Sequence, residues 1–188
     1  MRIVSGKYRG RRISAPNNLP VRPTTDMAKE ALFNILNNTY YLDEVSVLDL
    51  FAGIGSISFE FASRGCLDVL AVDANAGCIK FLETTNDQLD AGIQTIKSDV
   101  FKYLEKNNRK FDIIFADPPY AMETAKFVKL INLIFDRNLL NDQGILIIEH
   151  SKQTDLSEHA NFERARKYGG NVFSFFEATD AEASNSTD

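Results

Sequence analysis

Residues 47–56, with the sequence VLDLFAGIGS, decide the fold of this chain. A run of buried-type apolar residues gives way to a turn with two glycines and then to a helical pattern. This strand–turn–helix unit is typical of open parallel sheets, in which ligands lie beyond the carboxyl ends of the strands. Gly53 and Gly55 allow the backbone to pass close to a ligand, and the helix after them offers free N–H groups. The stretch therefore predicts a ligand-binding turn.

The same alternation of strands and helices continues along the chain. Apolar runs predict five strands, over residues 45–51, 67–73, 94–97, 111–116 and 144–149. Helical spacing predicts helices over residues 26–38, 56–64, 76–89, 100–106 and 123–135. Runs at 162–168 and 172–177 flank Gly169-Gly170 and predict a hairpin. The near-continuous apolar strands suit an α/β fold with helices on both faces of a parallel sheet.

Composition narrows the class of protein. With 188 residues, 44% hydrophobic and 25% charged, the chain suits one domain, or one domain with a small appendage, rather than a disordered or fibrous protein. We expect a basic hairpin and connector over residues 1–25, a main domain over 26–177 and a disordered acidic tail over 178–188. No apolar run approaches the roughly 20 residues that span a bilayer, and no signal peptide is recognisable. We expect a cytoplasmic monomer without membrane contact.

The few cysteines and histidines do not indicate a metal site. Cys66 and Cys78 are isolated, and His150 and His159 do not stand at zinc-ligand spacing from them. Neither cysteine has a partner for covalent catalysis. We therefore predict that the protein holds no metal.

The N-terminus is strongly basic although the net charge of the chain is −5. Residues 1–12 contain five basic side chains and no acid: Arg2, Lys7, Arg9, Arg11 and Arg12. Exposed charges act over roughly 8 Å at physiological salt, so this segment can bind phosphates in spite of the acidic body. A hairpin that is merely solvated is the alternative interpretation.

Two carboxylates accompany the glycine turn. Asp73 follows Gly53 by twenty residues, at the end of the next predicted strand, where it can accept both hydroxyls of a ribose. This pattern would serve a nicotinamide dinucleotide or an adenosyl ligand. The dinucleotide fingerprint requires a third glycine where this chain has Ser58. Asp49 would repel a pyrophosphate but suits an ammonium, which favours S-adenosylmethionine.

A third carboxylate, Asp99, follows the predicted strand at residues 94–97. Two interpretations carry equal weight: Asp99 accepts the adenine amino group of the ligand, or it caps the helix that begins at Val100.

The segment Asp117-Pro118-Pro119-Tyr120, here called the DPPY segment, follows the fourth predicted strand. An exocyclic amine on a nucleobase is a poor nucleophile because its lone pair is delocalised into the ring. The Asp117 carboxylate and the Pro118 carbonyl can accept its hydrogens, and two prolines hold these acceptors rigid. Tyr120 can stack on an extruded base, a contact worth roughly 1–3 kcal/mol. The alternative is a strand end capped by prolines.

Several segments together resemble the RsmD family, bacterial methyltransferases that act on the N2 amine of a guanine in 16S ribosomal RNA. They are the basic segment at residues 2–11, the RPTTD motif at 22–26 with EALFN at 30–34, the turn at 49–55, the DPPY segment and KYGG at 167–170. The resemblance covers about residues 2–177. It implies a class I S-adenosylmethionine-dependent methyltransferase, a Rossmann-like fold. Its seven-stranded, mostly parallel sheet would have the order 3-2-1-4-5-7-6, with a small basic N-terminal β-hairpin.

The resemblance also implies roles for individual residues. Asp49, Phe51, Ala52, Gly53 and Gly55 would hold the methionine moiety, Asp73 the ribose and Asp99 the adenine. We include the neighbours Ala74 and Val100 in this cofactor set. The DPPY segment would engage the guanine. The RNA would contact Arg2, Lys7, Tyr8, Arg9, Arg11 and Arg12, with Arg22 and Thr24 closing over the cofactor and target.

The sequence thus predicts methylation of guanine N2 in 16S ribosomal RNA, within an assembling or assembled small subunit. Four alternatives remain: adenine-N6 methylation of DNA or RNA, methylation of a glutamine amide, a nicotinamide oxidoreductase, and a non-catalytic RNA-binding module on the same fold. Glu149 and His150 end the fifth predicted strand, and we interpret them as polar residues at a strand terminus.

Overall fold

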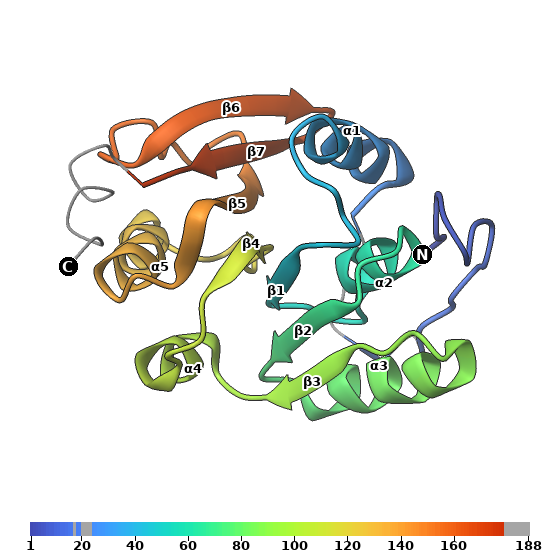
Figure 1. Ribbon diagram of the computed structural model, residues 1–188. Coiled ribbons are helices and arrows are strands. Elements are labelled where there is room, and N and C mark those ends of the chain that lie inside the picture. Colours follow the sequence, from blue (N-terminus) through green and yellow to red (C-terminus); the bar gives the residue numbers. More distant parts are fainter. Residues whose placement is uncertain (17, 20–23, 179–188) are drawn as a thin grey trace. The chain divides into compact units, whose positions relative to one another are not determined.

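The computed structural model describes residues 1–16, 18–19 and 24–178. The chain divides into two compact units, Met1–Val100 and Phe101–Asp188, called here the N-terminal and C-terminal units (Figure 1). The boundary between the two units follows Val100, the first residue of a helix. The boundaries predicted from the sequence instead follow residues 25 and 177.

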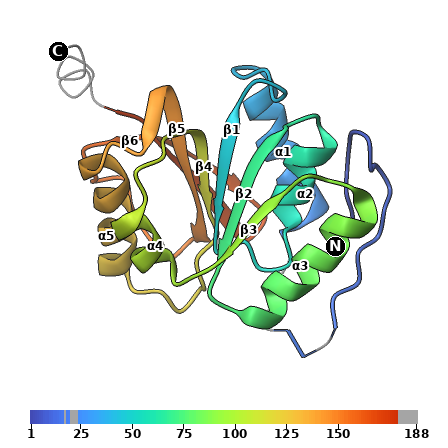
Figure 2. The ribbon, with the colours of Figure 1, turned by 60° about the horizontal axis from the view of Figure 1, so that its bottom comes forward.

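The described residues of the N-terminal unit form three parallel strands and three helices. They are α1 (Asp26–Asn37), β1 (Ser46–Leu50), α2 (Ser56–Ser63), β2 (Asp68–Asp73), α3 (Ala76–Leu89) and β3 (Gln94–Lys97). β2 pairs with β1 and with β3. α2 contacts β2, and α3 packs on β2 and β3 (Figure 2). The carboxyl ends of β1 and β2 consequently lie beside each other, next to the glycine turn described below.

Capping side chains determine where two of these helices begin. The Thr25 hydroxyl accepts a hydrogen bond from the Ala28 N–H at 3.2 Å. The Asn75 side chain accepts the N–H groups of Gly77 and Cys78 at the start of α3. Each cap satisfies N–H groups that the first turn of a helix leaves without partners. The cap of α3 therefore lies two residues after Asp73.

The C-terminal unit contains a mixed sheet and one long helix. After α4 (Val100–Lys106), its elements are β4 (Phe111–Ala116), α5 (Thr124–Asp136), β5 (Leu140–Ser151), β6 (Phe162–Tyr168) and β7 (Asn171–Phe176). β5 is parallel to β4, whereas β7 is antiparallel to β5 and to β6. The β6–β7 pair is the hairpin predicted around Gly169-Gly170.

The strands follow the order β3-β2-β1-β4-β5-β7-β6 in one seven-stranded sheet. This confirms the predicted order and the mostly parallel sheet, in which β7 is the antiparallel strand. The bounds of α3, β3, α4 and β4 also agree with prediction. β5 is longer than the predicted 144–149 because it begins at Leu140 and continues through a bulge, where Gln143 has a φ of 61°.

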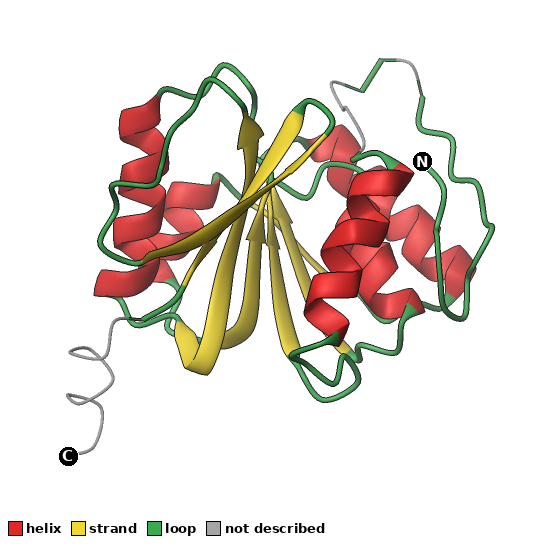
Figure 3. Ribbon diagram, turned by 90° about the horizontal axis from the view of Figure 1, so that it is seen from above, coloured by secondary structure: helices red, strands yellow, loops and turns green. Residues whose placement is uncertain are grey.

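The N-terminal arm (residues 1–13) corrects one prediction. A β-hairpin was expected here, but the arm contains a single β-bridge, between Arg2 and Arg12, and Figure 3 draws it as loop. Two hydrogen bonds cross the arm beside this bridge, from the Ile3 N–H to the Arg11 carbonyl at 3.0 Å and from the Ile13 N–H to the Met1 carbonyl at 2.9 Å. The pairing does not extend further because the next N–H groups bond to α2. Val4 and Ser5 donate to the Glu60 carboxylate, and Lys7 donates to the Ser63 carbonyl. The arm is therefore an irregular loop held against a helix.

Candidate functional site

The glycine turn (residues 51–55) joins β1 to α2 with an unusual backbone. Phe51, Gly53 and Gly55 have φ values of 59°, 54° and 82°. A positive φ is unusual for a phenylalanine and costs free energy, and such residues cluster at ligand sites. At Gly55 a Cβ would lie 3.0 Å from atoms of Leu82 and Phe59. The turn is thus closely packed against α2 and α3, and Phe51 is half-buried.

Asp73, at the end of β2, holds this turn in place. Its Oδ2 accepts the Gly53 N–H at 2.8 Å, and its Oδ1 accepts the Asn75 N–H at 2.7 Å. A carboxylate oxygen has two lone pairs, so each keeps acceptor capacity. The half-buried Asp73 can therefore accept hydrogen bonds from a ligand while it fixes the glycine turn.

Asp49 lies within β1 and is 1% exposed. Its Oδ2 accepts two hydrogen bonds from Ser58, from the N–H at 3.1 Å and from the hydroxyl at 2.5 Å. Burial raises the pKa of Asp49 to about 7, the hydrogen bonds from Ser58 oppose this, and the charge of Asp73 adds to it. A cationic ligand group would offset the cost of burying this carboxylate.

Ser56, the first residue of α2, is a residue that sequence reasoning missed. Its Oγ is buried, and among the buried side-chain nitrogen and oxygen atoms of the described residues it is the one without a hydrogen-bond partner. Buried polar groups without a partner are uncommon in proteins and call for an explanation. A polar ligand atom at the N-terminus of α2 would supply that partner, so the turn fits an amino-acid-like ligand with both an ammonium and a carboxylate.

The remaining residues of the predicted cofactor set are placed as follows. Ala52 donates its N–H to the Val72 carbonyl at 3.1 Å, within the turn. Ala74 and Asp99 are exposed and Val100 is buried. The Ser98 N–H bonds to the Asp73 carbonyl at 3.0 Å, which brings the loop before Asp99 to the end of β2. Asp99 directly precedes α4, so both of its interpretations remain.

The DPPY segment directly follows β4 in the C-terminal unit. Asp117 is half-buried, Pro118 is buried, and Pro119 and Tyr120 are exposed. The Met122 N–H donates to the Pro119 carbonyl at 2.8 Å, which closes a turn after the second proline. The segment therefore presents a carboxylate and an aromatic ring from a rigid backbone.

Two residues distant in sequence extend this segment, and the sequence analysis missed their role. The Tyr120 hydroxyl donates to the Asn171 Oδ1 at 2.9 Å. Asn171 in turn donates through its Nδ2 to the Glu149 Oε1. Both residues lie in strands, Asn171 at the start of β7 and Glu149 near the end of β5. The spacing of 51 and 22 residues along the chain offers no signal in a single sequence.

The buried His150 side chain contacts residues of its own unit through both ring nitrogens and through the ring itself. Its Nε2 lies 2.7 Å from the Ser174 Oγ and its Nδ1 lies 2.9 Å from the Ser151 carbonyl oxygen. Burial lowers its pKa, and the hydrogen bond to Ser151 partly offsets this effect. The Phe127 ring packs against it edge-on, with ring centroids 6.2 Å apart. These contacts agree with the interpretation of His150 as a polar residue at a strand terminus.

The arm is held on α2 by buried polar groups. Glu60 is 0% exposed and accepts the N–H groups of Val4 and Ser5 at 2.9 and 3.0 Å. The Ser63 hydroxyl accepts the Tyr8 N–H and donates to the Ser5 carbonyl. A Cβ at Gly6, where φ is 81°, would lie 1.8 Å from the Ser63 carbonyl oxygen, so only glycine fits. The arm is therefore preformed.

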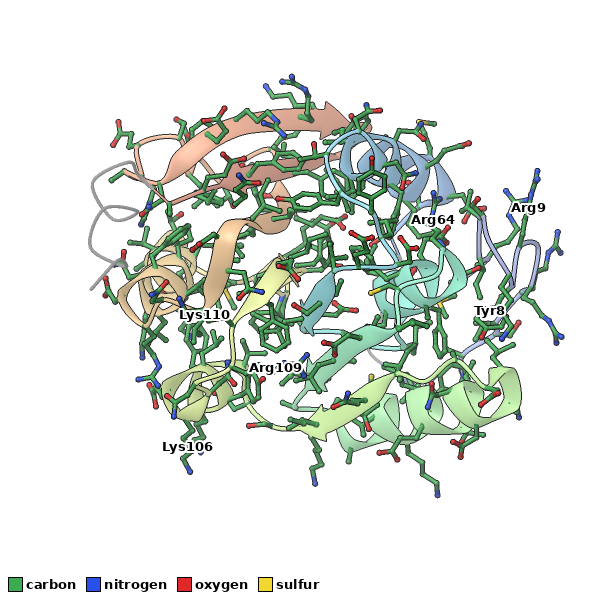
Figure 4. All side chains as sticks on the ribbon, in the orientation of Figure 1. Tyr8, Arg9, Arg64, Lys106, Arg109 and Lys110 are labelled. Carbon is green, nitrogen blue, oxygen red and sulfur yellow. The ribbon has the colours of Figure 1, made fainter. Side chains whose placement is uncertain are left out.

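Most predicted RNA-contacting residues are exposed on this arm. Arg2, Lys7, Arg9, Arg11 and Arg12 are exposed, and Figure 4 shows Arg9 pointing away from the arm's own ribbon. Arg2 forms a salt bridge with Asp26 at 2.8 Å. Tyr8 is buried and donates through its hydroxyl to the Asp90 carbonyl, which makes it an anchor of the arm. Thr24 is buried, and Arg22 lies outside the described residues.

Neither a metal cluster nor a membrane span occurs among the described residues. No group of three or more His, Cys, Asp or Glu side chains gathers there as a metal site would require. No described helix has the length and hydropathy needed to cross a membrane.

The strand order and the glycine turn define the class I methyltransferase fold, and solved structures agree. The hypothetical protein TTHA0928 of Thermus thermophilus is 26% identical, with a TM-score of 0.82 over 95% of this chain and 99% of that one. The 16S rRNA methyltransferase RsmC of T. thermophilus is 21% identical and shares the fold, with a TM-score of 0.69 over 86% of this chain and 45% of that one.

Sequence comparisons identify the family. The family described as Conserved hypothetical protein 95 matches residues 1–177. The ribosomal RNA small subunit methyltransferase D of Buchnera aphidicola is 32% identical over 79% of this chain and 75% of that protein. The protein of the same name from Escherichia coli K12 is 29% identical over 83% and 77%. The chain therefore belongs to this family, the RsmD family of rRNA methyltransferases, as the sequence predicted.

Proposed function

We propose that the protein transfers a methyl group from S-adenosylmethionine to the N2 amine of a guanine in 16S ribosomal RNA. The observation that carries the proposal is the DPPY segment, a rigid carboxylate and an anchored aromatic ring directly after β4, in a member of the RsmD family. Relatives over most of the chain are named as small subunit methyltransferases, which supports this RNA as the substrate.

The N-terminal unit would hold the cofactor, whose contribution when bound is an electrophilic methyl group on a sulfonium. The Asp49 carboxylate would bind the ammonium of its methionine moiety, and the unpartnered Ser56 hydroxyl would bind the carboxylate. The remaining lone pairs of Asp73 would accept the ribose hydroxyls. Asp99 would accept the adenine amino group. These assignments include every carboxylate predicted for the cofactor and add Ser56.

The DPPY segment would hold the acceptor amine. The Asp117 carboxylate and the Pro118 carbonyl would accept its two hydrogens, which favours a tetrahedral nitrogen with a lone pair free to attack. Because the prolines restrict the backbone, the acceptors need little rearrangement in the transition state. Tyr120 would stack on the face of the base. Proximity and preorganised acceptors would supply most of the acceleration.

The arm would bind the RNA backbone. Its side chains Lys7, Arg9, Arg11 and Arg12 are exposed, and an arginine guanidinium suits phosphate oxygens. Because hydrogen bonds to α2 hold the arm in place, little conformational entropy would be lost on binding. With such a substrate the protein would act in the cytoplasm, as a monomer on a small subunit.

The decisive experiment is tritiated methyl transfer to small subunits from cells that lack this protein, followed by mapping of the labelled nucleotide. The proposal expects N2-methylguanosine at one position. Label in N6-methyladenosine would establish the adenine alternative instead, and label in protein would indicate an amide substrate. Calorimetric titration without any S-adenosylmethionine binding would favour a non-catalytic RNA-binding module.

A further inference from the structure

We propose that Asn171 is a positioning residue for Tyr120, and that the buried Glu149 fixes Asn171 in the orientation this requires. The inference rests on the proposed function, because it takes Tyr120 as the residue that stacks on the target base. It assigns roles to two residues, from β5 and β7, outside the DPPY segment.

Tyr120 occupies an exposed position. The side chain is 47% exposed and follows two prolines in a loop. An exposed tyrosine on a loop populates several rotamers, and ordering it on binding the base would cost free energy. The hydrogen bond from its hydroxyl to the Asn171 Oδ1 restrains the far end of the ring. The ring can thus be oriented before the base arrives.

Asn171 has a side chain with two chemically different ends. An amide has one end that accepts and one end that donates hydrogen bonds. A carboxylate only accepts, so Glu149 requires the Nδ2 of Asn171 on its side. This leaves the Oδ1 facing the Tyr120 hydroxyl, as observed. Glu149 therefore determines which end of the amide Tyr120 meets.

The support behind Asn171 is rigid. Glu149 is 2% exposed, and a buried carboxylate is held strongly to its donors because losing one is costly. It lies opposite Phe173 in the β5–β7 ladder, and Asn171 lies opposite Ser151. The Gly169-Gly170 turn places Asn171 as the first residue of β7, with a positive φ of 59° at Gly169. Hydrogen bonds thus connect a strand ladder to the ring of Tyr120.

The test begins with Asn171→Ala, Tyr120→Phe and the double variant. Each single change removes the same hydrogen bond, so we expect each to lower kcat/KM for RNA by about 3- to 10-fold, mainly through kcat. The double variant should be no worse than the poorer single variant, because the two residues act through one contact. The Kd for S-adenosylmethionine should change by less than about twofold. If the losses in kcat/KM of the two single variants multiply in the double variant, the inference is overturned.

Exchanging the carboxylate and the amide between positions 149 and 171 gives a test that does not depend on any loss of stability in the single variants. Asn171→Asp alone sets two carboxylates against each other, and activity should fall more than in the alanine variant. Adding Glu149→Gln should restore activity to within about threefold of wild type, because the donor and acceptor roles are then exchanged. In the double variant the new carboxylate at position 171 accepts from both the new amide at position 149 and the Tyr120 hydroxyl. Absence of this rescue, in a folded double variant that binds the cofactor, would overturn the inference.

Ser174→Ala is the matched control, because it removes a buried hydrogen bond of the same hairpin, to His150, without touching Tyr120. It should lower the Tm and leave kcat within about twofold. A loss of kcat equal to that of Asn171→Ala would show that the hairpin matters only for folding. If wild-type protein labels guanine and the swap fails, only this inference is wrong. If wild-type protein labels no guanine, the proposed function is wrong and the inference with it.

Discussion

Asp49 and Ser58 are joined by two hydrogen bonds to a single carboxylate oxygen, at 3.1 Å from the N–H and 2.5 Å from the hydroxyl. The serine that stands where a dinucleotide-binding turn has its third glycine is thus the partner that helps to keep a buried acid ionised. Even so, burial dominates and the pKa of Asp49 is raised to about 7. The charge of this carboxylate therefore changes within the physiological pH range.

The first prediction is that cofactor affinity depends on pH. The ammonium of S-adenosylmethionine binds the ionised form of Asp49, and this form disappears as the pH falls through about 7. Between about pH 7.5 and pH 6 the affinity should fall roughly tenfold, the change expected for one titrating group. Calorimetry at several pH values measures this. Asp49→Asn should show a flat profile, and a flat profile in the wild-type protein would exclude Asp49 as the ammonium ligand.

The second prediction is that Asp49→Asn stabilises the free protein while weakening cofactor binding. The pKa of Asp49 in the folded state, about 7, lies above the ordinary 3.8. The folded state therefore binds the proton more tightly, and this stability is lost as the pH rises through about 7. At pH 8 the substitution should raise the free energy of unfolding by about 2–4 kcal/mol.

Thermal denaturation at two pH values checks this second prediction. The gain in Tm should be clear at about pH 8 and much smaller at about pH 5, where Asp49 is already neutral in the folded wild-type protein but still ionised in the unfolded chain. The variant should bind S-adenosylmethionine about 10- to 100-fold more weakly, since it loses a hydrogen bond between charged groups. A lower Tm at the higher pH would contradict the prediction.

The third prediction concerns Asp117. Asp117→Ala removes one preorganised acceptor from the target amine, and turnover should fall by about 10²- to 10³-fold. Asp117→Asn keeps an acceptor oxygen and should retain much more activity. The cofactor Kd should be unchanged in both, as measured by titration. Equal losses in the two variants would show that the negative charge, rather than the acceptor, is required.

The fourth prediction compares two sets of basic residues. Arg9, Arg11 and Arg12 changed together to Gln should weaken RNA binding and reduce the slope of log K against log salt by roughly two to three. A matched control removes the same charge elsewhere, at Lys106, Arg109 and Lys110, from the end of α4 to the residue before β4 (Figure 4). The control should change affinity far less. Equal effects would mean that net charge, not the arm, governs binding.

Local patterns in the sequence predict most of the fold. α3, α4 and β4 could be predicted because their apolar spacing is regular and capping or turn residues mark their ends. β3 was also predicted with its observed bounds, although Ile96 is its one apolar residue. The start of β5 could not, because Asn141, Asp142 and Gln143 interrupt the apolar run inside the strand, at the bulge between Leu140 and Ile145. Such a polar stretch is typical of a loop.

Long-range hydrogen bonds account for what the sequence could not reveal at the site. The arm resembles a hairpin by its glycines, yet several of its N–H groups bond to Glu60 and Ser63, more than 50 residues away. The contacts of Tyr120 with Asn171, and of Asn171 with Glu149, exist only after β5 and β7 have paired. The importance of Ser56 depends on its burial without a partner. These features depend on tertiary structure, which a single sequence does not encode at any fixed spacing.

Helix α2 begins at the glycine turn. Glu60 and Ser63, one and two turns further along this helix, form hydrogen bonds to the arm. A chimera of this protein with a relative must therefore keep the contacts between the arm and α2. A transplanted arm would need its glycine at position 6 and matching partners at positions 60 and 63, or it would detach from its support. The natural unit of exchange is therefore the arm together with α2, and crossover points placed after Ser63 should give better-folded chimeras than points placed between the arm and α1.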